Sequence, residues 1–243
     1  MKKLIIFILL ILILFHAHSV AESIAIVTFN WKPYVGKELK HNGVHAYIVR
    51  EAFKRVGISV NFDFYPWKRA YKMALYGKAF LICASDVKER RKIFIYSDPY
   101  DNAASYLIGL KRKEYNGSKK FKNKYIGVLR GHYLVKFLQK KGAKIIEVNK
   151  DISNLRNLII GRLDFVAMSK IPAIYIVKNN SEINLPLDKF VFYEPPLRDN
   201  PVHLIGHKDM VNSEEVILKF NKGLTQIKKD GTYNSIMAEF GFK

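Results

Sequence analysis

The feature that most constrains the fold is an alternation of strand-like and helix-like segments that occurs twice along the chain. Short apolar runs are followed by segments with apolar residues at helical spacing, many of them bounded by glycine. In the first unit, strands are predicted at 23–29, 58–65 and 79–85 and helices at 43–57 and 67–77. In the second unit, strands are predicted at 125–131, 143–148 and 162–169 and helices at 132–142, 151–161 and 170–179. Such alternation predicts a mixed or parallel sheet with helices on both faces. We therefore expect two consecutive α/β lobes rather than one long sheet.

Two similar segments bracket the second unit. YLIGLKRK at 106–113 precedes it and HLIGHKD at 203–209 follows it. This arrangement is expected of two strands that cross between lobes, so we place crossovers at 106–111 and 202–206. The predicted domains are a discontinuous first lobe of residues 22–111 and 202–243 and an inserted second lobe of residues 112–201.

Three local features complete this organisation. The stretch 111–124 is polar and basic and contains glycine, so we expect a solvated linker or surface loop. The C-terminal segment predicts two amphipathic helices broken at Asp230 and Gly231. Asp151 is expected to cap the helix that starts there.

The first 21 residues have the pattern of a secretory signal peptide. A basic start, MKK, precedes twelve apolar residues at 4–15, and the small residues SVA at 19–21 precede Glu22. Twelve apolar residues are too few to span a bilayer, which takes about 20. We expect cleavage after Ala21 and a monomeric product, free of a membrane anchor, in the periplasm. An uncleaved anchor is the alternative.

The cysteine content and the charge narrow the function classes. Cys83 is the only cysteine, so the chain can form no internal disulfide, and its apolar surroundings favour a buried, inert thiol. The formal net charge of +20 favours anionic partners, such as a carboxylate or phosphate ligand or cell-envelope polyanions. Nucleic acid is not expected of an exported chain that lacks a nucleic-acid motif. The sequence also has no HExxH, phosphate loop or cofactor motif, so neither a cofactor nor a metal is expected.

Several motifs together resemble the bacterial extracellular solute-binding proteins of family 3, the polar-amino-acid type. The most specific is the C-terminal FNKGLTQIKKDGTYNSIMAEFG; ERRKIFIYSDPY, GVLRG, GRLD, NWKPYV and FYPWKRA add to it. The resemblance covers essentially the whole mature chain. It implies the two-lobed periplasmic binding protein clamp (type II), in which each lobe is a mixed sheet flanked by helices and two hinge strands join the lobes. It also implies that the protein captures a small solute by hinge closure and serves an inner-membrane ABC importer.

The resemblance assigns the ligand's carboxylate to Arg90. In this family, the arginine before an FSxPY-like strand binds the α-carboxylate, and a guanidinium in a closing cleft can do so with two parallel hydrogen bonds. The alternative is a structural ion pair of Arg90 with Asp98 or Glu89. Arg91, on the other side of the chain, is interpreted as surface charge. Ser85 is expected to donate its hydroxyl to the same carboxylate.

Three aromatic residues of the first unit are candidates for the wall of the cleft. Trp31 and Tyr34 lie in the loop after the first strand, and Trp67 begins the helix after the second. Both positions follow the carboxyl ends of strands, where open α/β sheets bind ligands. Flat rings can stack on a planar ligand group or face a cation. The alternative for these rings is core packing.

The second unit offers an anion site at Gly131, His132 and Tyr133. These residues precede a predicted helix, where free backbone N–H groups and the helix dipole attract a carboxylate. The family holds its ligand at this turn with a small hydroxyl residue, so His132 and Tyr133 should narrow the pocket. His132 is not expected to bind metal, because no second His or Cys stands at metal-ligand spacing.

One departure from the family limits the ligand. Amino-acid binders carry an acidic residue just after the GRxD strand, where it pairs the α-ammonium, whereas this chain has Ser169 followed by Lys170. The family's aspartate in the GKAD segment is replaced by Phe80. We therefore expect a small, carboxylate-bearing ligand that is anionic or neutral.

Two other functions fit the same scaffold. A few family members are dehydratases of cyclic carboxylic acids, resembling cyclohexadienyl dehydratase, and these need a general acid in the cleft. Only Glu194 and His132 qualify as candidates for that acid. An orphan ligand sensor is the third interpretation. Binding without catalysis is the function that we expect.

Overall fold

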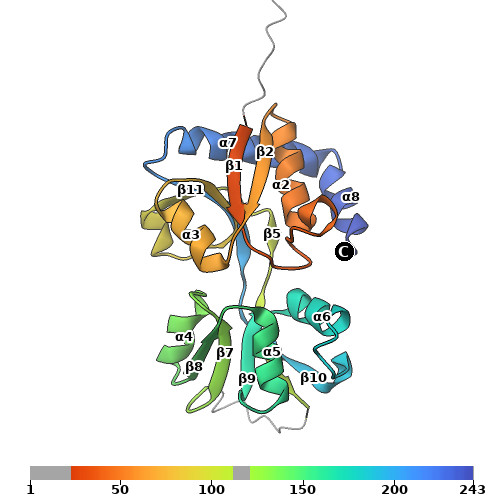
Figure 1. The fold of residues 1–243 in the computed structure, drawn as a ribbon. Coiled ribbons are helices and arrows are strands. Elements are labelled where there is room, and N and C mark those ends of the chain that lie inside the picture. Colours follow the sequence, from red (N-terminus) through yellow and green to blue (C-terminus); the bar gives the residue numbers. More distant parts are fainter. Residues whose placement is uncertain (1–22, 112–120, 243) are drawn as a thin grey trace, which may run out of the picture.

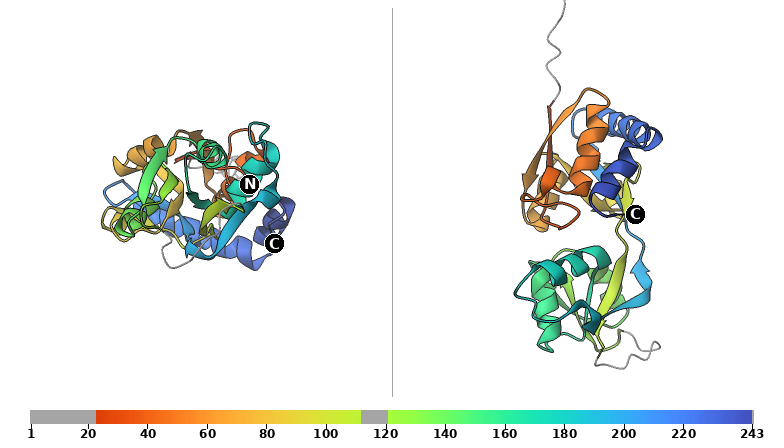
Figure 2. Two further views of the ribbon diagram at one scale, coloured as in Figure 1. Left: turned by 90° about the horizontal axis from the view of Figure 1, so that it is seen from below. Right: turned by 90° about the vertical axis from the view of Figure 1, so that its right-hand side faces the viewer.

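The computed structural model describes residues 23–111 and 121–242, which form two α/β lobes arranged end to end (Figure 1). Two extended segments run side by side between the lobes, as the side view in Figure 2 shows. The predicted signal peptide and most of the predicted linker lie outside the described residues.

The first lobe is a mixed sheet with helices on both faces. Its strands have the order β2-β1-β3-β11-β4, with β5 paired to β11; β1 is parallel to β2 and β3, and β11 is antiparallel to β3, β4 and β5. The bounds are β1 (Ser23–Thr28), β2 (Ser59–Phe64), β3 (Phe80–Ser85), β4 (Phe94–Tyr96), β5 (Asp101–Asn102), β11 (Pro201–His207), α2 (Val44–Lys54), α3 (Trp67–Leu75), α7 (Ser213–Lys229) and α8 (Thr232–Glu239).

The second lobe repeats this architecture. Its strands have the order β10-β6-β9-β7-β8; β7 is parallel to β8 and β9, and β6 is antiparallel to β9 and β10. The bounds are β6 (Ser105–Leu110), β7 (Tyr125–Leu129), β8 (Lys144–Val148), β9 (Phe165–Ser169), β10 (Phe190–Arg198), α4 (Leu134–Lys140), α5 (Asp151–Ile159) and α6 (Lys170–Asn179).

The strand pairing moves the boundary between the lobes. The sequence predicted a crossover at 106–111, but β6 pairs along its length with strands of the second sheet. The chain therefore passes between the sheets at 103–104 and returns at 199–200. The similar residues 106–110 and 203–207 lie in β6 and β11 and so belong to different sheets, and the predicted first boundary at residue 111 lies too late.

Each sheet buries side chains on both faces. In the first lobe, α2 and α7 cover a large core that includes Ile26, Phe53 and Phe220, and α3 covers a smaller one. In the second lobe, α5 and α6 cover one face and α4 the other. Burial on both faces of a sheet explains why the central strands β3 and β9 are buried at every position.

The predicted C-terminal helices are present and pack on the first lobe. The break falls at Gly231, whose φ of 82° is unfavourable for residues with a side chain. The predicted cap at Asp151 is wrong, because Lys150 is the capping residue and Asp151 lies in the first turn of α5. Within the described part of the chain, none of the helices is long and apolar enough to cross a membrane.

Candidate functional site

A cavity lies between the lobes, at the carboxyl ends of the parallel strands of both sheets. Its volume is about 30 Å³, and it adjoins a groove of about 830 Å³ that shares part of its lining. The cavity is lined by residues of both lobes and of the returning crossover: Phe29, Trp31, Trp67, Cys83, Ser85, Leu129, His132, Tyr133, Asp151, Ala167, Met168, Ser169 and Asn200.

The structure brings together most of the residues that the sequence predicted for the site. Six line the cavity, namely Trp31, Trp67, Ser85, His132, Tyr133 and Ser169. Arg90, Gly131 and Tyr34 do not line the cavity themselves, but each lies next to a lining residue.

Phe29, Trp31 and Trp67 form an aromatic wall on the first lobe. The ring of Phe29 lies 5.7 Å from that of Trp31 and 5.0 Å from that of Trp67, measured between centroids. The indole Nε1 of Trp67 lies 3.5 Å from the Gly131 carbonyl oxygen and so links the two lobes. Phe29 was not predicted, although it is the last residue of the predicted first strand.

Tyr34 is a core residue rather than part of the cleft wall. It is 2% exposed, and its ring stacks on that of His45 at 4.4 Å. Burial raises the pKa of its hydroxyl. The loop after β1 turns back onto α2, which covers Tyr34 while leaving Trp31 beside the cavity.

Arg90 lies behind the aromatic wall with an incomplete set of hydrogen bonds. Its side chain is 9% exposed, and its guanidinium lies 4.7 Å from the ring centroid of Tyr71 and 5.5 Å from that of Trp67. The Nη1 atom is buried without a hydrogen-bond partner. An unsatisfied buried donor is costly unless a ligand satisfies it. The 3₁₀ turn Arg90–Lys92 before β4 sets this position.

Arg91 shows the contrast on the other side of the same turn. Its Nε and Nη2 donate to the two carboxylate oxygens of Asp86 at 2.8 and 2.6 Å. The side chain is half-exposed, and Arg91 lowers the pKa of Asp86 by this hydrogen bonding. The ion pair supports the interpretation of Arg91 as surface charge.

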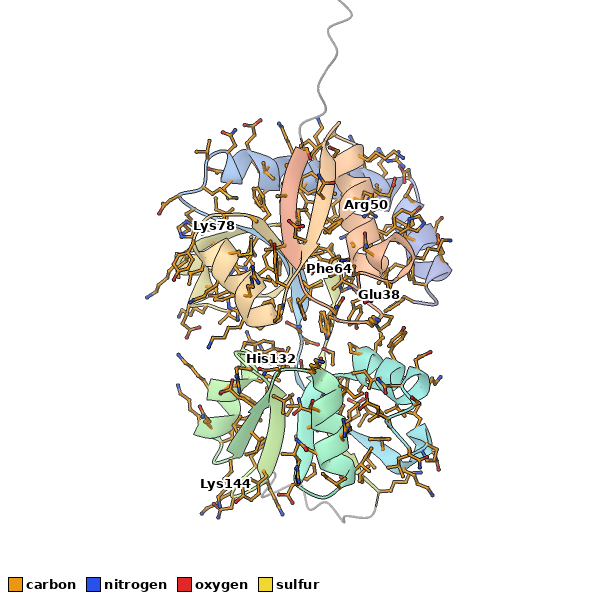
Figure 3. The ribbon with its side chains drawn as sticks, in the orientation of Figure 1. Glu38, Arg50, Phe64, Lys78, His132 and Lys144 are labelled. Atoms are coloured by element: carbon orange, nitrogen blue, oxygen red, sulfur yellow. The ribbon has the colours of Figure 1, made fainter. Side chains whose placement is uncertain are left out.

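His132 is a neutral imidazole at the cavity. Desolvation and the charge of Arg90 together lower its pKa to about 3. Its Nδ1 accepts a hydrogen bond from the backbone N–H of Leu134 at 3.3 Å, so Nε2 carries the proton. Figure 3 labels His132 on the face of the second lobe that meets the first. The neighbouring Tyr133 hydroxyl is 3.0 Å from the hydroxyl of Ser105.

The predicted backbone anion site at this turn is largely occupied by the protein itself. The Gly131 N–H donates to Glu147 Oε2 at 2.8 Å, and the His132 N–H donates to the Leu129 carbonyl at 3.0 Å. The Leu134 N–H is also used, because it donates to Nδ1 of His132, so few backbone donors remain for a carboxylate. The prediction missed this because Glu147, on β8, approaches the turn only in the folded sheet.

Ser169 ends β9 at the cavity and is 3% exposed. Its hydroxyl donates to the carbonyl of Ala103 on the outgoing crossover at 2.9 Å. The ammonium of Lys170 lies over the rings of Tyr106 and Phe192, at 5.5 and 5.6 Å. Ser169 therefore ties the second lobe to the crossover, and Lys170 is engaged by aromatic rings.

Asp151, which was not among the predicted site residues, lines both the cavity and the groove. Desolvation raises its pKa to about 6. Its sequence position could have predicted this location. Asp151 follows the carboxyl end of β8, just as Trp31 and Trp67 follow the ends of strands in the first lobe. Interpreting it as a helix cap concealed this role. It supplies an acid that Ser169 does not.

Other chemistry at the site is limited. Glu194, one of the two candidate acids, is exposed on β10 and does not line the cavity. Across residues 23–111 and 121–242, no group of three or more His, Cys, Asp or Glu residues is arranged to hold a metal ion.

Comparisons with known proteins agree with this architecture. A histidine kinase sensor domain with similarity to periplasmic binding proteins superposes with a TM-score of 0.79 at 17% identity, over 91% of this chain and 97% of that one. The substrate binding protein of an amino acid ABC transporter gives 0.75 at 16%, over 90% and 99%. The ancestral amino acid-binding protein described as a precursor of cyclohexadienyl dehydratase gives 0.74 at 21%, over 91% and 96%. At these identities the likeness shows the fold. A search of curated proteins gives no significant match.

The sequence itself matches the family model described as bacterial extracellular solute-binding proteins, family 3, over residues 26–243. That match spans both lobes, the crossovers and the C-terminal helices. The chain belongs to the bacterial extracellular solute-binding proteins of family 3.

Proposed function

We propose that the protein captures a small carboxylate-bearing solute between its lobes and delivers it, as a monomeric periplasmic protein, to an inner-membrane ABC importer. The observation that carries this proposal is the buried Nη1 of Arg90, which has no hydrogen-bond partner beside an interlobe cavity. A ligand carboxylate would satisfy this donor in surroundings of low dielectric, where a charge-assisted hydrogen bond is strong.

Asp151 revises the expected charge of the ligand. Asp151 is half-buried and lines the cavity together with Phe29, Trp31 and Trp67. A carboxylate beside aromatic faces is a favourable site for a positive group. We therefore propose that the ligand carries a cationic group near Asp151 as well as a carboxylate near Arg90. This replaces the expectation of an anionic or neutral ligand, which rested on Ser169.

Capture would proceed by closure of the lobes about the crossovers. Arg90, Trp31 and Trp67 belong to one lobe and Asp151 and His132 to the other, so a ligand that contacts both sets stabilises the closed arrangement. The Nη2 of Arg198, at the end of β10, donates to the Asp86 carbonyl at 3.1 Å, one of the contacts that join the lobes near the crossovers.

The neutral His132 and the exposed Glu194 support binding over the dehydratase alternative. His132 is a neutral imidazole with a pKa of about 3, so it lacks the acidic proton that a general acid donates near neutral pH. A sensor would share the same clamp, so the importer and sensor roles differ in the partner rather than in the site.

The proposal is tested on protein purified from an exporting host. We expect native mass spectrometry to detect a retained small molecule and a chain that begins at Glu22. We also expect a thermal-shift screen of polar amino acids to find a ligand, because 100 times the dissociation constant stabilises a protein by about 2.7 kcal/mol. A protein that retains nothing, and whose melting temperature no carboxylate-bearing solute raises, would contradict the proposal.

The role of Asp151 predicts a pH dependence of binding. Because its pKa in the folded protein is raised to about 6, the carboxylate is mostly protonated at pH 5 and mostly ionised at pH 7. Affinity for a cationic probe, L-arginine, should therefore rise about tenfold over this range. In the ligand-free protein, stability changes with pH in the opposite direction to affinity. The raised pKa of Asp151 stabilises the folded protein at low pH, and this stabilisation is lost as the pH rises through about 6.

Calorimetric titration at pH 5, 6 and 7 measures this dependence. We expect Asp151→Asn to bind L-arginine more weakly at pH 7 and without the rise. Asp188→Asn, an exposed position of the same lobe, should behave like the unmodified protein. Binding of L-arginine by Asp151→Asn with the unmodified pH profile would show that another group governs it.

A further inference from the structure

A β-bulge in β3 changes the direction of the side chain of Cys83 from that in a regular strand. Residues 82 and 83 of β3 face only residue 204 of β11, which makes a β-bulge, and Cys83 has a φ of 60°. A left-handed φ is unfavourable for a residue with a side chain, and bulges re-aim side chains. The thiol therefore lies on the α2 side of the sheet, where Ile82 also packs.

The thiol of Cys83 contacts His45, and His45 in turn contacts Asp101. The Sγ of Cys83 is 3.4 Å from Nδ1 of His45, and Nε2 of His45 is 2.7 Å from Oδ2 of Asp101. His45 is fully buried, and Asp101 is 15% exposed. The short contact with a carboxylate fixes the proton of His45 on Nε2, so Nδ1 is free to accept the thiol proton. This order of groups is the one that activates a nucleophilic cysteine.

Two hydroxyl groups complete the surroundings of the thiol. The Tyr100 hydroxyl donates to Sγ at 3.6 Å and accepts the backbone N–H of Cys83 at 2.8 Å. Thr28 is fully buried beside the thiol, and its side chain lowers the pKa of Cys83 against the larger, opposite effect of burial.

Cys83 is also one of the residues that line the interlobe cavity. Only 3% of the surface of Cys83 is exposed, so a reactant that reaches its sulfur has to be very small. Hydrogen peroxide is little larger than water, is polar and is electrophilic.

We propose that Cys83, with His45 as its base and Asp101 as the group that orients His45, is a site of oxidation by hydrogen peroxide. The sulfur attacks one peroxide oxygen, so that the S–O bond forms as the O–O bond breaks. His45 accepts the thiol proton and returns it to the departing hydroxide, which leaves as water. Sulfur loses two electrons and the peroxide gains them, and the products are a cysteine sulfenic acid and water.

The surroundings of the thiol make the base necessary. Burial raises the pKa of Cys83 to about 12, so the resting group is the protonated thiol. A thiol of high pKa is a strong nucleophile once its proton is removed, and the rate then depends on the base that removes it. The groups that face His45 are the rings of Trp31, Tyr34 and Tyr100 together with Cys83 and Asp101, so Asp101 is the charged partner among them.

The test uses the fact that Cys83 is the only cysteine. The full-length protein, reduced and then freed of reductant, is treated with excess hydrogen peroxide at pH 7; samples are quenched in denaturant and the remaining thiol is counted. We expect the folded protein to lose its thiol at least about tenfold faster than the same protein in urea. Trapping with dimedone before mass spectrometry should label Cys83 as the sulfenic acid.

Variants identify the base. His45→Asn should slow the folded-state reaction by on the order of 100-fold, and Asp101→Asn, which keeps the imidazole, should slow it by a smaller factor. Asp98→Asn, an exposed position three residues from Asp101, should react like the unmodified protein. Circular dichroism checks that each variant is folded, and Asp101→Asn carries the test if His45→Asn is not. A folded protein that reacts no faster than the unfolded one, or a folded Asp101→Asn that reacts at the unmodified rate, would overturn the proposal.

Discussion

Replacing Arg90 with alanine is expected to weaken binding of a carboxylate-bearing ligand by about 30- to 1000-fold. The change removes a charge-assisted pair worth on the order of 2–4 kcal/mol in a desolvated site. The structure favours this expectation, because the guanidinium packs against the rings of Tyr71 and Trp67 and its donor Nη1 has no hydrogen-bond partner. A group that waits in its binding geometry loses little entropy when the ligand arrives.

The same substitution should change stability little. The contacts with two aromatic rings are lost, but so is the cost of a buried donor without a partner, and these effects oppose each other. Arg91→Ala is the matched control, since it lies one residue away and loses a half-exposed ion pair with Asp86, worth about 0–1 kcal/mol, and a contact with the ring of Tyr96. It should leave affinity unchanged.

Calorimetric titration and thermal unfolding of both variants separate the two interpretations of Arg90. If Arg90→Ala binds the ligand normally but unfolds at a lower temperature, Arg90 is a structural residue and the carboxylate site lies elsewhere. If Arg91→Ala loses affinity instead, the two arginines have been assigned in the wrong order.

The largest loss of stability is expected from Gly223→Ala, in the middle of α7. A Cβ at this position would lie 1.9 Å from the carbonyl oxygen of Ala52 on α2, so the two helices would have to move apart. Taken alone, alanine favours a helix over glycine by about 1 kcal/mol. The clash is with backbone atoms, which cannot rotate away, so it outweighs the gain in helix propensity. We expect the free energy of unfolding to fall by about 3 kcal/mol or more.

Thermal unfolding measures this effect. For a chain of this size the melting temperature should fall by about 6–12 °C, since each kcal/mol shifts it by about 2–4 °C. Lys222→Ala, an exposed change in the same turn of α7, should stay within about 0.5 kcal/mol of the unmodified protein. An unchanged or higher melting temperature for Gly223→Ala would mean that α2 and α7 adjust at little cost.

The candidate site was predicted in part, for a reason that can be stated. Trp31, Trp67 and Ser85 follow or end strands, and carboxyl ends of parallel strands meet at one edge of a sheet, so sequence position alone brings them near the cleft. Tyr34 shares that location but is covered by α2, and no local pattern shows which side of a loop another element will cover. Asp151 was missed for the converse reason, since its local context suggested a cap.

Hydrogen bonding between distant elements also escaped the sequence. The N–H groups at the turn before α4 were expected to be free, but Glu147 reaches Gly131 from β8. Cys83 was expected to be an inert core thiol, and burial is confirmed, yet the bulge in β3 places it against His45. Both outcomes depend on register between strands, which is set by the whole sheet.

The sequence by itself determined the order and type of most elements, the division into two lobes and the family. These follow from local periodicity, from glycines at the ends of helices and from motifs of a few residues, all of which act over short distances along the chain. The tertiary structure alone decided which side chains converge on the cleft, which donors remain free and which glycine cannot be replaced. Those properties depend on atoms that are far apart in sequence, such as Gly223 and Ala52 or Cys83 and His45, and come into contact only when the elements pack.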